Sequence, residues 1–402
     1  ASAVWKKRQR IMVLPATWLA LRRTSSSKIA HAFPNIAWND NLQVPYFYVL
    51  STVSSCARTT RRMARPRWML LLQASALRKL MDFGMFLHRL HPPRPRPPSF
   101  RRSIPVTVSP RKGTIELLFY TPSDYLARLQ NNEALKYPVL LNFHAGGFTI
   151  GRANDDARWA TAVVDIVGAV VVCVNYRLAP KWYFPTAVED GVDAILYLVR
   201  NADELRIDAY QIGVSGFSSG GNMAFTVPLR FQEELCRMSD REQLPANSTG
   251  REGGRVIVII SWYPPTDFAT NTRSERRKTN IRPDTELPRS VTKLFDASYL
   301  YPPHNVSLSN CYLSPGLAPD EILGELQDDI IIYTCEWDGL RAEAERFKER
   351  LVGDLGKRVR YTVVQGVRHG WDKSPDPFKR SPTRELTYRE ACVELKRIFE
   401  GR

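Results

Sequence analysis

Cysteine and histidine are scarce in this 402-residue chain, which contains six residues of each. The cysteines form no CxxC motif and no cluster with histidine at the spacing of metal ligands. This distribution excludes a small disulfide-bonded scaffold and predicts reduced thiols, no metal site and an intracellular location. Two glycosylation sequons, at Asn247 and Asn305, matter only in a secretory compartment. The cysteines are Cys56, Cys173, Cys236, Cys311, Cys335 and Cys392.

Long apolar runs are absent as well, because no uninterrupted stretch reaches the roughly 18 residues of a membrane-spanning helix. The nearest candidates are residues 11–21, which follow a basic segment, and the uncharged stretch 41–57. The first resembles the core of a signal peptide, but Arg22 and Arg23 follow it instead of a small-residue cleavage site. We expect membrane-surface association or organelle targeting through this region, with a disordered extension as the alternative.

Acidic residues are nearly missing from the first quarter of the chain. Residues 1–115 contain 21 of the 57 Lys and Arg but only Asp40 and Asp82, a net charge of +19, and the remainder carries −3. A nucleic-acid-binding protein usually carries its basic surface on the folded recognition module, so we expect no nucleic-acid partner. Residues 1–60 are therefore predicted to be a basic N-terminal arm, disordered or used for targeting or membrane contact.

Large apolar side chains recur at every third or fourth position in residues 67–91, the spacing of an amphipathic helix. The proline-rich sequence of residues 92–98 then ends the helix in a stiff linker. Residues 61–98 are therefore predicted to form a cap helix and its linker. The recurring residues are Trp68, Leu72, Ala76, Leu80, Phe83, Leu87 and Leu90.

From residue 99 to residue 402, short β-branched apolar segments alternate with helical segments. Such alternation is typical of an α/β domain in which helices cover both faces of a mostly parallel, doubly wound sheet. The polar stretch 263–327 interrupts the alternation, and we interpret it as an insertion that belongs to a helical cap. Predicted strands span residues 104–108 and 115–120, paired at an edge, and 138–143, 169–175, 211–215, 256–262, 330–334 and 359–364; predicted helices span 157–167, 187–201, 221–234 and 341–351.

A G-x-S-x-G motif at residues 216–220 lies between a predicted strand and a predicted helix. The glycines allow a tight turn, and the central serine is exposed at the helix N-terminus. Ser218 is therefore the candidate nucleophile, with a structural glycine turn as the alternative.

A second loop, residues 144–148, follows the strand at 138–143 with the sequence HAGGF. Small residues there let backbone N–H groups face a developing oxyanion. We expect an oxyanion hole formed by the N–H groups of Gly146, Gly147 and Ser219. No second ligand lies near His144, so we expect it to brace the loop by hydrogen bonds to the backbone rather than to bind a metal.

The ends of two later strands carry an acid and a base. Asp338 follows the strand at 330–334, and His369 follows the strand at 359–364. The chain order Ser218, Asp338, His369 is the order of the α/β-hydrolase fold and differs from that of chymotrypsin-like and subtilisin-like proteases. These three residues are the predicted catalytic triad.

Over about residues 100–400 the sequence resembles the hormone-sensitive-lipase-like esterases, the α/β-hydrolase fold-3 family. The similarity includes the NYRLAP sequence at residues 175–180, the FP pair at 184–185 and the LSP sequence at 313–315. It implies an α/β-hydrolase fold with a helical cap, carboxylic ester hydrolysis without a cofactor, and the triad and oxyanion roles given above. Two positions depart from the family pattern, because Ala145 replaces a glycine and Phe217 replaces an acid.

These observations predict a serine carboxylesterase that cleaves short-to-medium acyl esters of small molecules through an acyl-enzyme. The alternative is a catalytically weak, receptor-like protein that binds a small ligand on the same scaffold. Lipase, lactonase and amidase activities use the same machinery, and the oligomeric state is open. We expect Phe217 to crowd the elbow and six large side chains to lie near the mouth of a finite pocket: Trp68, Leu72, Phe83, Phe86, Phe295 and Tyr299.

Overall fold

The structure is a computed structural model that describes residues 65–131, 133–240, 254–303, 305–375, 378 and 381–401. The basic arm predicted for residues 1–60, its apolar stretches 11–21 and 41–57, and Asn247 lie outside the described residues. Asn305 is described and is exposed. Within the described ranges, no helix has both the length and the hydropathy needed to cross a bilayer.

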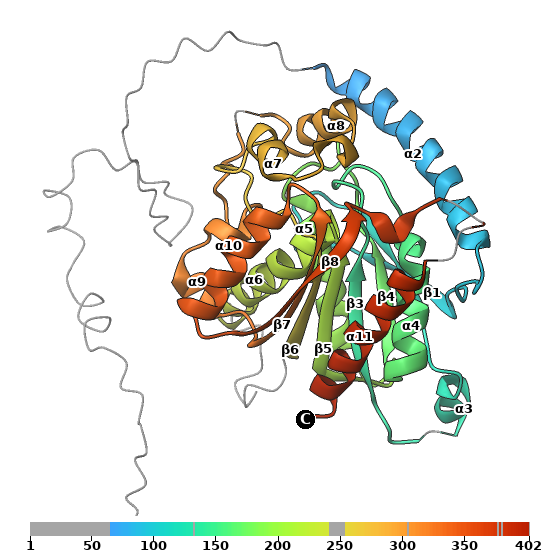
Figure 1. Ribbon diagram of the computed structural model, residues 1–402. Coiled ribbons are helices and arrows are strands. Elements are labelled where there is room, and N and C mark those ends of the chain that lie inside the picture. The colour runs from blue at the N-terminus through green and yellow to red at the C-terminus, as the bar shows by residue number, and fades with distance from the viewer. Residues whose placement is uncertain are drawn as a thin grey trace, which may run out of the picture. The chain divides into compact units, whose positions relative to one another are not determined.

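Eight strands of the described chain form one sheet in the order β1-β2-β4-β3-β5-β6-β7-β8 (Figure 1). β2 pairs antiparallel with both β1 and β4, and all the other pairs are parallel. The predicted mostly parallel, doubly wound sheet is therefore confirmed. The strands are β1 (Phe100–Pro105), β2 (Thr114–Tyr120), β3 (Tyr137–Phe143), β4 (Val170–Asn175), β5 (Ile207–Phe217), β6 (Val256–Trp262), β7 (Asp329–Trp337) and β8 (Arg358–Arg368).

Helices cover both faces of this sheet, with α4 and α11 in contact on one face and α5 and α6 in contact on the other (Figure 1). The predicted insertion contains the short helices α7, α8 and α9. The helices are α2 (Arg67–Leu90), α3 (Tyr125–Gln130), α4 (Ala157–Val167), α5 (Thr186–Arg200), α6 (Ser219–Asp240), α7 (Arg273–Thr279), α8 (Arg289–Tyr299), α9 (Asp320–Gly324), α10 (Arg341–Gly353) and α11 (Pro382–Phe399).

The core consists of two apolar layers, one on each face of the sheet. On one side, Phe225 of α6 packs edge-on against Phe347 of α10, with ring centroids 5.0 Å apart. On the other side, Trp159 of α4 packs against Trp262 of β6 and Tyr388 of α11, each at 5.2 Å. Each such buried aromatic contributes roughly 1.5–3 kcal/mol through the hydrophobic effect, so both layers hold the strand ends in place.

β1 and α11 are among the elements that differ from the sequence prediction. The first edge strand was expected at residues 104–108, but β1 spans Phe100–Pro105, because the ladder to β2 continues through the exposed residues Arg101 and Arg102. α11 was not predicted, since its 18 residues are largely polar. Its buried residues Tyr388, Leu395 and Phe399 lie seven and four positions apart and so share one helix face.

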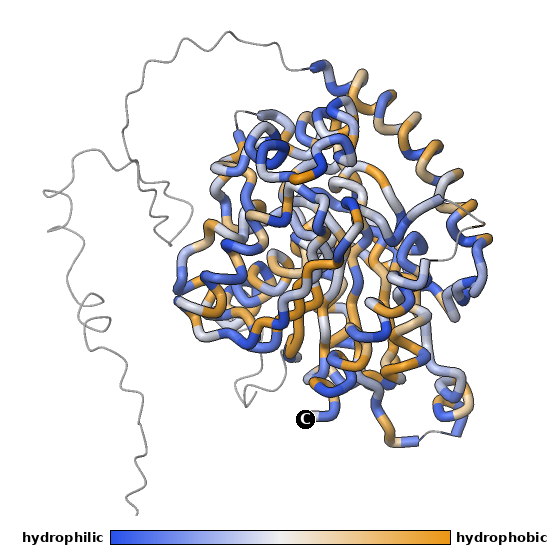
Figure 2. The backbone as a smooth tube through the Cα atoms, in the orientation of Figure 1, coloured by the Kyte–Doolittle hydropathy of each residue, from blue (hydrophilic) through white to orange (hydrophobic). Residues whose placement is uncertain are grey.

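The predicted helix at residues 67–91 is confirmed as α2, which begins after Pro66 and ends before the proline-rich linker. Its buried residues are Leu70, Ala74, Met85 and His88. Most of the apolar stripe that defined it in the sequence lies on the opposite side and is exposed, whereas Leu87 is half-buried. Figure 2 shows hydrophobic positions recurring along α2.

Candidate active site

Ser218 lies in a sharp turn between β5 and α6. Its φ of +52° is in the left-handed region, a strained conformation typical of this turn. The neighbouring glycines are required by close packing: a Cβ on Gly216 would lie 2.1 Å from the carbonyl oxygen of Gly220, and one on Gly220 would lie 2.0 Å from that of Phe143. The backbone N–H of Ser218 donates to the carbonyl of Trp262 at 2.8 Å, which fixes the turn to β6.

The structure brings the three residues predicted as a triad together. Ser218 Oγ lies 2.9 Å from His369 Nε2, and His369 Nδ1 lies 2.6 Å from Asp338 Oδ2. A carboxylate only accepts hydrogen bonds, so Nδ1–H donates to Asp338 and Nε2 accepts from the Ser218 hydroxyl. Asp338 is buried and its other oxygen accepts from the N–H of Leu340 at 3.0 Å, which holds the carboxylate against the imidazole. This is the geometry in which a histidine can take a serine proton.

Two of the three residues predicted as oxyanion donors lie in the pocket that contains Ser218. Gly147 and Ser219 line the pocket that contains Ser218 and His369. Gly146, which directly precedes Gly147, has a φ of +123°. A Cβ on Gly146 would lie 2.1 Å from the carbonyl oxygen of Ile150. A side chain at Gly146 would therefore disrupt the turn.

His144 braces the loop, as the sequence suggested. Its Nδ1–H donates to the carbonyl of Ala145 at 2.7 Å, and its ring stacks on Tyr176 at 4.2 Å. The Tyr176 hydroxyl donates to the carbonyl of His144 at 2.8 Å. Burial lowers the pKa of His144 to about 4, so this imidazole stays neutral and adds no charge near the site.

Phe217 was expected to crowd the elbow, but it does not line the pocket. Its side chain is fully buried under the turn, where it stacks on Trp262 at 5.3 Å. Lys373 Nζ lies 3.6 Å from the centre of the Phe217 ring. Position 217 precedes the outward turn at Ser218, so its side chain still follows the alternation of β5 and points into the core.

Lys373 belongs to a buried charge network that the sequence did not reveal. Its Nζ lies 2.9 Å from Asp156 Oδ1 and 2.7 Å from Asp372 Oδ2. Burial alone would lower the pKa of Lys373, but the two carboxylates outweigh that effect and raise it. Asp372 also accepts from Tyr263 at 2.5 Å, and the Tyr263 ring lies edge-on to His369 at 4.8 Å. The network therefore supports one side of the His369 imidazole.

A pocket of about 310 Å³ opens above Ser218 and is covered largely by the insertion. Phe295 and Tyr299 of α8 line it, as predicted. The other four side chains expected at the mouth do not: no residue of α2 lines the pocket in the described part of the chain. Trp68, Leu72, Phe83 and Phe86 are instead at least half exposed.

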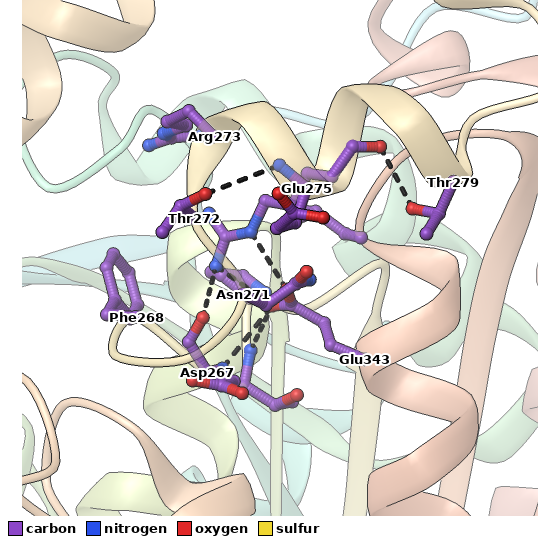
Figure 3. Close-up of polar contacts among 12 residues, drawn as sticks. Asp267, Phe268, Asn271, Thr272, Arg273, Glu275, Thr279 and Glu343 are labelled. Carbon is purple, nitrogen blue, oxygen red and sulfur yellow. Dashed lines mark hydrogen bonds and ion pairs between the residues drawn. The ribbon is translucent and has the colours of Figure 1, made fainter.

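A buried ion pair fixes the insertion to α10. Arg276 donates from Nε and Nη2 to the two carboxylate oxygens of Glu343 at 2.8 and 3.1 Å. Glu343 also accepts hydrogen bonds from the side chain of Asn271 and from the backbone N–H of Thr266 (Figure 3). These bonds hold the loop that leads into α7 against α10. A Cβ on Gly339, which follows Asp338, would lie 2.3 Å from the carbonyl oxygen of Arg276. The ion pair thus lies against the segment that carries Asp338, and no local sequence signal marks it.

The sheet, the turn at Ser218 and the polar groups at the strand ends together define an α/β hydrolase. Residues 140–373 match the model of a family described by its α/β hydrolase fold, the fold-3 group of hormone-sensitive-lipase-like esterases. The chain belongs to this family and is a carboxylic ester hydrolase.

Two curated relatives and one solved structure illustrate the similarity. The chain is 36% identical to an ethyl acetate hydrolase of Pseudomonas putida, over 66% of this chain and 74% of that protein. It is 28% identical to an arylesterase of Saccharolobus solfataricus, over 65% and 75%. The crystal structure of the carboxylesterase EstE1 from a metagenomic library superposes with a TM-score of 0.63 at 26% identity, covering 81% of this chain and 97% of that one. The receptor-like alternative gains no support from these relatives.

Proposed function

We propose that Ser218 is the nucleophile of a serine carboxylesterase and that His369 and Asp338 activate it. His369 Nε2 takes the hydroxyl proton while Ser218 Oγ attacks the ester carbonyl. Asp338 keeps the imidazole in the required tautomer and stabilises its charged form. His369 then gives the proton to the leaving alcohol, and water repeats the cycle on the acyl-enzyme. The hydrogen-bonded chain from Ser218 through His369 to Asp338 is the observation that carries this proposal.

The N–H groups of Gly147 and Ser219, with that of Gly146, are proposed to stabilise the tetrahedral oxyanion. The positions of Gly147 and Ser219 on the pocket wall beside Ser218 support this role. Such donors act only where charge develops, and removing one typically lowers the rate roughly 10²–10³-fold.

The triad is tested by a matched pair of neighbouring variants. Ser218→Ala removes the nucleophilic oxygen, and we expect kcat/KM on p-nitrophenyl butyrate to fall roughly 10⁴-fold or more. Ser219→Ala should keep most of the activity, because the proposed role of Ser219 uses only its backbone N–H and its side chain is buried. Circular dichroism verifies that both variants fold. Retention of turnover in folded Ser218→Ala would refute the assignment.

The substrate range is proposed to be short-to-medium acyl esters of small molecules. The pocket is finite, and Phe295 and Tyr299 give it apolar walls. Each methylene that enters gains about 0.8 kcal/mol until the pocket is full. We therefore expect kcat/KM over p-nitrophenyl esters to rise from acetate, peak at short-to-medium length and fall toward palmitate. A flat series, or one still rising at palmitate, contradicts this range.

A further inference from the structure

The outer face of α2 is an apolar stripe without a partner in the described part of the chain. The side chains of Leu80, Leu72 and Trp68 are 67%, 64% and 61% exposed. Single exposed hydrophobic residues are ordinary, but a continuous patch of them marks an interaction surface. The stripe consists of Trp68, Leu72, Leu80, Phe83, Phe86 and Leu90, whose spacing places them on one helix face.

Polar interactions on the opposite face fix this orientation. Arg78 donates to the carbonyls of Thr149 and Ala179 at 2.9 and 2.7 Å, and Asp82 pairs with Arg152 at 2.7 Å. The ring of buried His88 is hydrogen-bonded to the carbonyl of Ser374 at 2.9 Å. The helix therefore cannot turn its stripe inward without losing these interactions, so the stripe stays uncovered by the described residues.

The charges near the stripe are positive. Lys79 lies on the exposed face of α2, and Arg65 and Arg94 flank the helix; all three are exposed and none has a carboxylate partner among the described residues. The one acidic residue of α2, Asp82, is already paired with Arg152. Lys79 is seven positions from both Leu72 and Phe86 and so lies within the stripe, whereas Arg65 and Arg94 lie beyond its ends. An apolar face with these cations matches a bilayer surface with anionic headgroups.

We propose that the outer face of α2 is a docking surface for anionic membranes, with the stripe entering the boundary between headgroups and acyl chains. A second copy of the chain fits less well, because Lys79 is close to the middle of α2 and an antiparallel two-fold pair would bring Lys79 against its own counterpart. The preceding residues 1–64 also fit less well, since they carry ten Lys and Arg and only Asp40 as an acid. α2 contacts α8, so docking brings the pocket-bearing helix to the lipid surface.

Vesicle flotation of the full chain tests this proposal. We expect binding to vesicles that contain phosphatidylserine, weaker binding to phosphatidylcholine alone, and loss of binding at high salt. Leu72→Gln combined with Phe83→Gln should lower the partition coefficient about tenfold or more. The matched control, Leu126→Gln with Val393→Gln, changes equally exposed apolar residues outside α2 and should bind as the wild type does.

A second readout separates the stripe from the basic arm. The chain contains nine tryptophans, so the signal of Trp68 is the part of the fluorescence quenching by lipids with brominated acyl chains that Trp68→Phe removes. We expect Trp68→Phe to remove a clear part of that quenching. Vesicle binding of the stripe variant at the wild-type level, or no quenching of Trp68, overturns the proposal. So does a wild-type dimer that the stripe variant converts to a monomer, or a stripe variant that unfolds at a clearly lower temperature, because either result assigns the stripe a protein partner. Turnover of a soluble ester is not involved, so these outcomes are independent of the triad.

Discussion

α8 and α2 are both amphipathic helices of the region predicted as the cap, and they use their apolar faces in opposite ways. α8 turns Leu294, Phe295 and Tyr299 inward, where Phe295 and Tyr299 wall the pocket. α2 turns its larger apolar residues outward and packs through a narrow strip that includes Leu70, Ala74 and Met85. The difference shows that periodicity identifies an apolar face but does not say whether protein covers it. The orientation of α2 is set by polar contacts between residues distant in sequence, such as those of the Arg78 side chain with the backbone carbonyls of Thr149 and Ala179.

The largest difference in activity should come from two glycine-to-alanine substitutions, one at Gly147 against α8 and one at Gly84 in α2. Gly147→Ala places a Cβ 2.3 Å from Phe295 Cδ2, in a residue with φ of +57°, so the loop or α8 must move. Displacing the proposed oxyanion donor should lower kcat roughly 10²–10³-fold. The measurement is steady-state turnover of a short-chain ester.

Gly84→Ala in α2 is the matched control. Its new Cβ would lie 3.7 Å from Pro375 Cβ, an ordinary contact, so turnover should stay at the wild-type value. Helix propensity should raise the free energy of unfolding by up to about 1 kcal/mol. Equal turnover in Gly147→Ala and Gly84→Ala would contradict the different roles assigned to the surroundings of α8 and α2.

A smaller effect is expected from truncating one phenylalanine on each helix. Phe295→Ala should lower the free energy of unfolding by about 3 kcal/mol, the lower end for a buried phenylalanine, because the pocket side of its ring lacks packing partners. Phe83 is 60% exposed, so Phe83→Ala should stay within about 0.5 kcal/mol. Urea denaturation measures both. Phe295→Ala should also move the acyl-chain optimum to longer esters, and similar losses in the two variants would contradict the assigned orientations.

The smallest effect is the pH dependence of stability that comes from His88, on the buried face of α2. Burial lowers the pKa of His88 to about 3, and Arg158 donates to its Nε2 at 3.1 Å, so the ring is neutral when folded. The unfolded chain takes up this proton near pH 6.5, so the folded state loses stability as pH falls below that value. Between pH 6.5 and 5.5 the contribution is about 1 kcal/mol. His88→Gln should show a correspondingly shallower loss in denaturation experiments, and identical pH dependence in both proteins would disprove the effect.

The sequence predicted the sheet and the meeting of Ser218, Asp338 and His369, because both depend on local patterns. Ser218, Asp338 and His369 each follow a strand, and a parallel sheet brings strand ends to one edge. Phe217 was misplaced because a motif does not state which way a residue before the turn points. Lys373 and Asp156 are 217 positions apart, and Arg276 and Glu343 are 67 positions apart, so no short sequence window contains either pair. Their role becomes visible only from tertiary contacts.

The central claim is that Ser218 forms the acyl-enzyme, and the most direct test is to trap that intermediate. The full chain is treated with an activated phosphonate ester, and its peptides are analysed by mass spectrometry. The account predicts one adduct per chain, on the peptide with Ser218 and at that residue, with none in Ser218→Ala and slow formation in His369→Ala. An adduct on another residue at wild-type rate, or full labelling of folded Ser218→Ala, would contradict it.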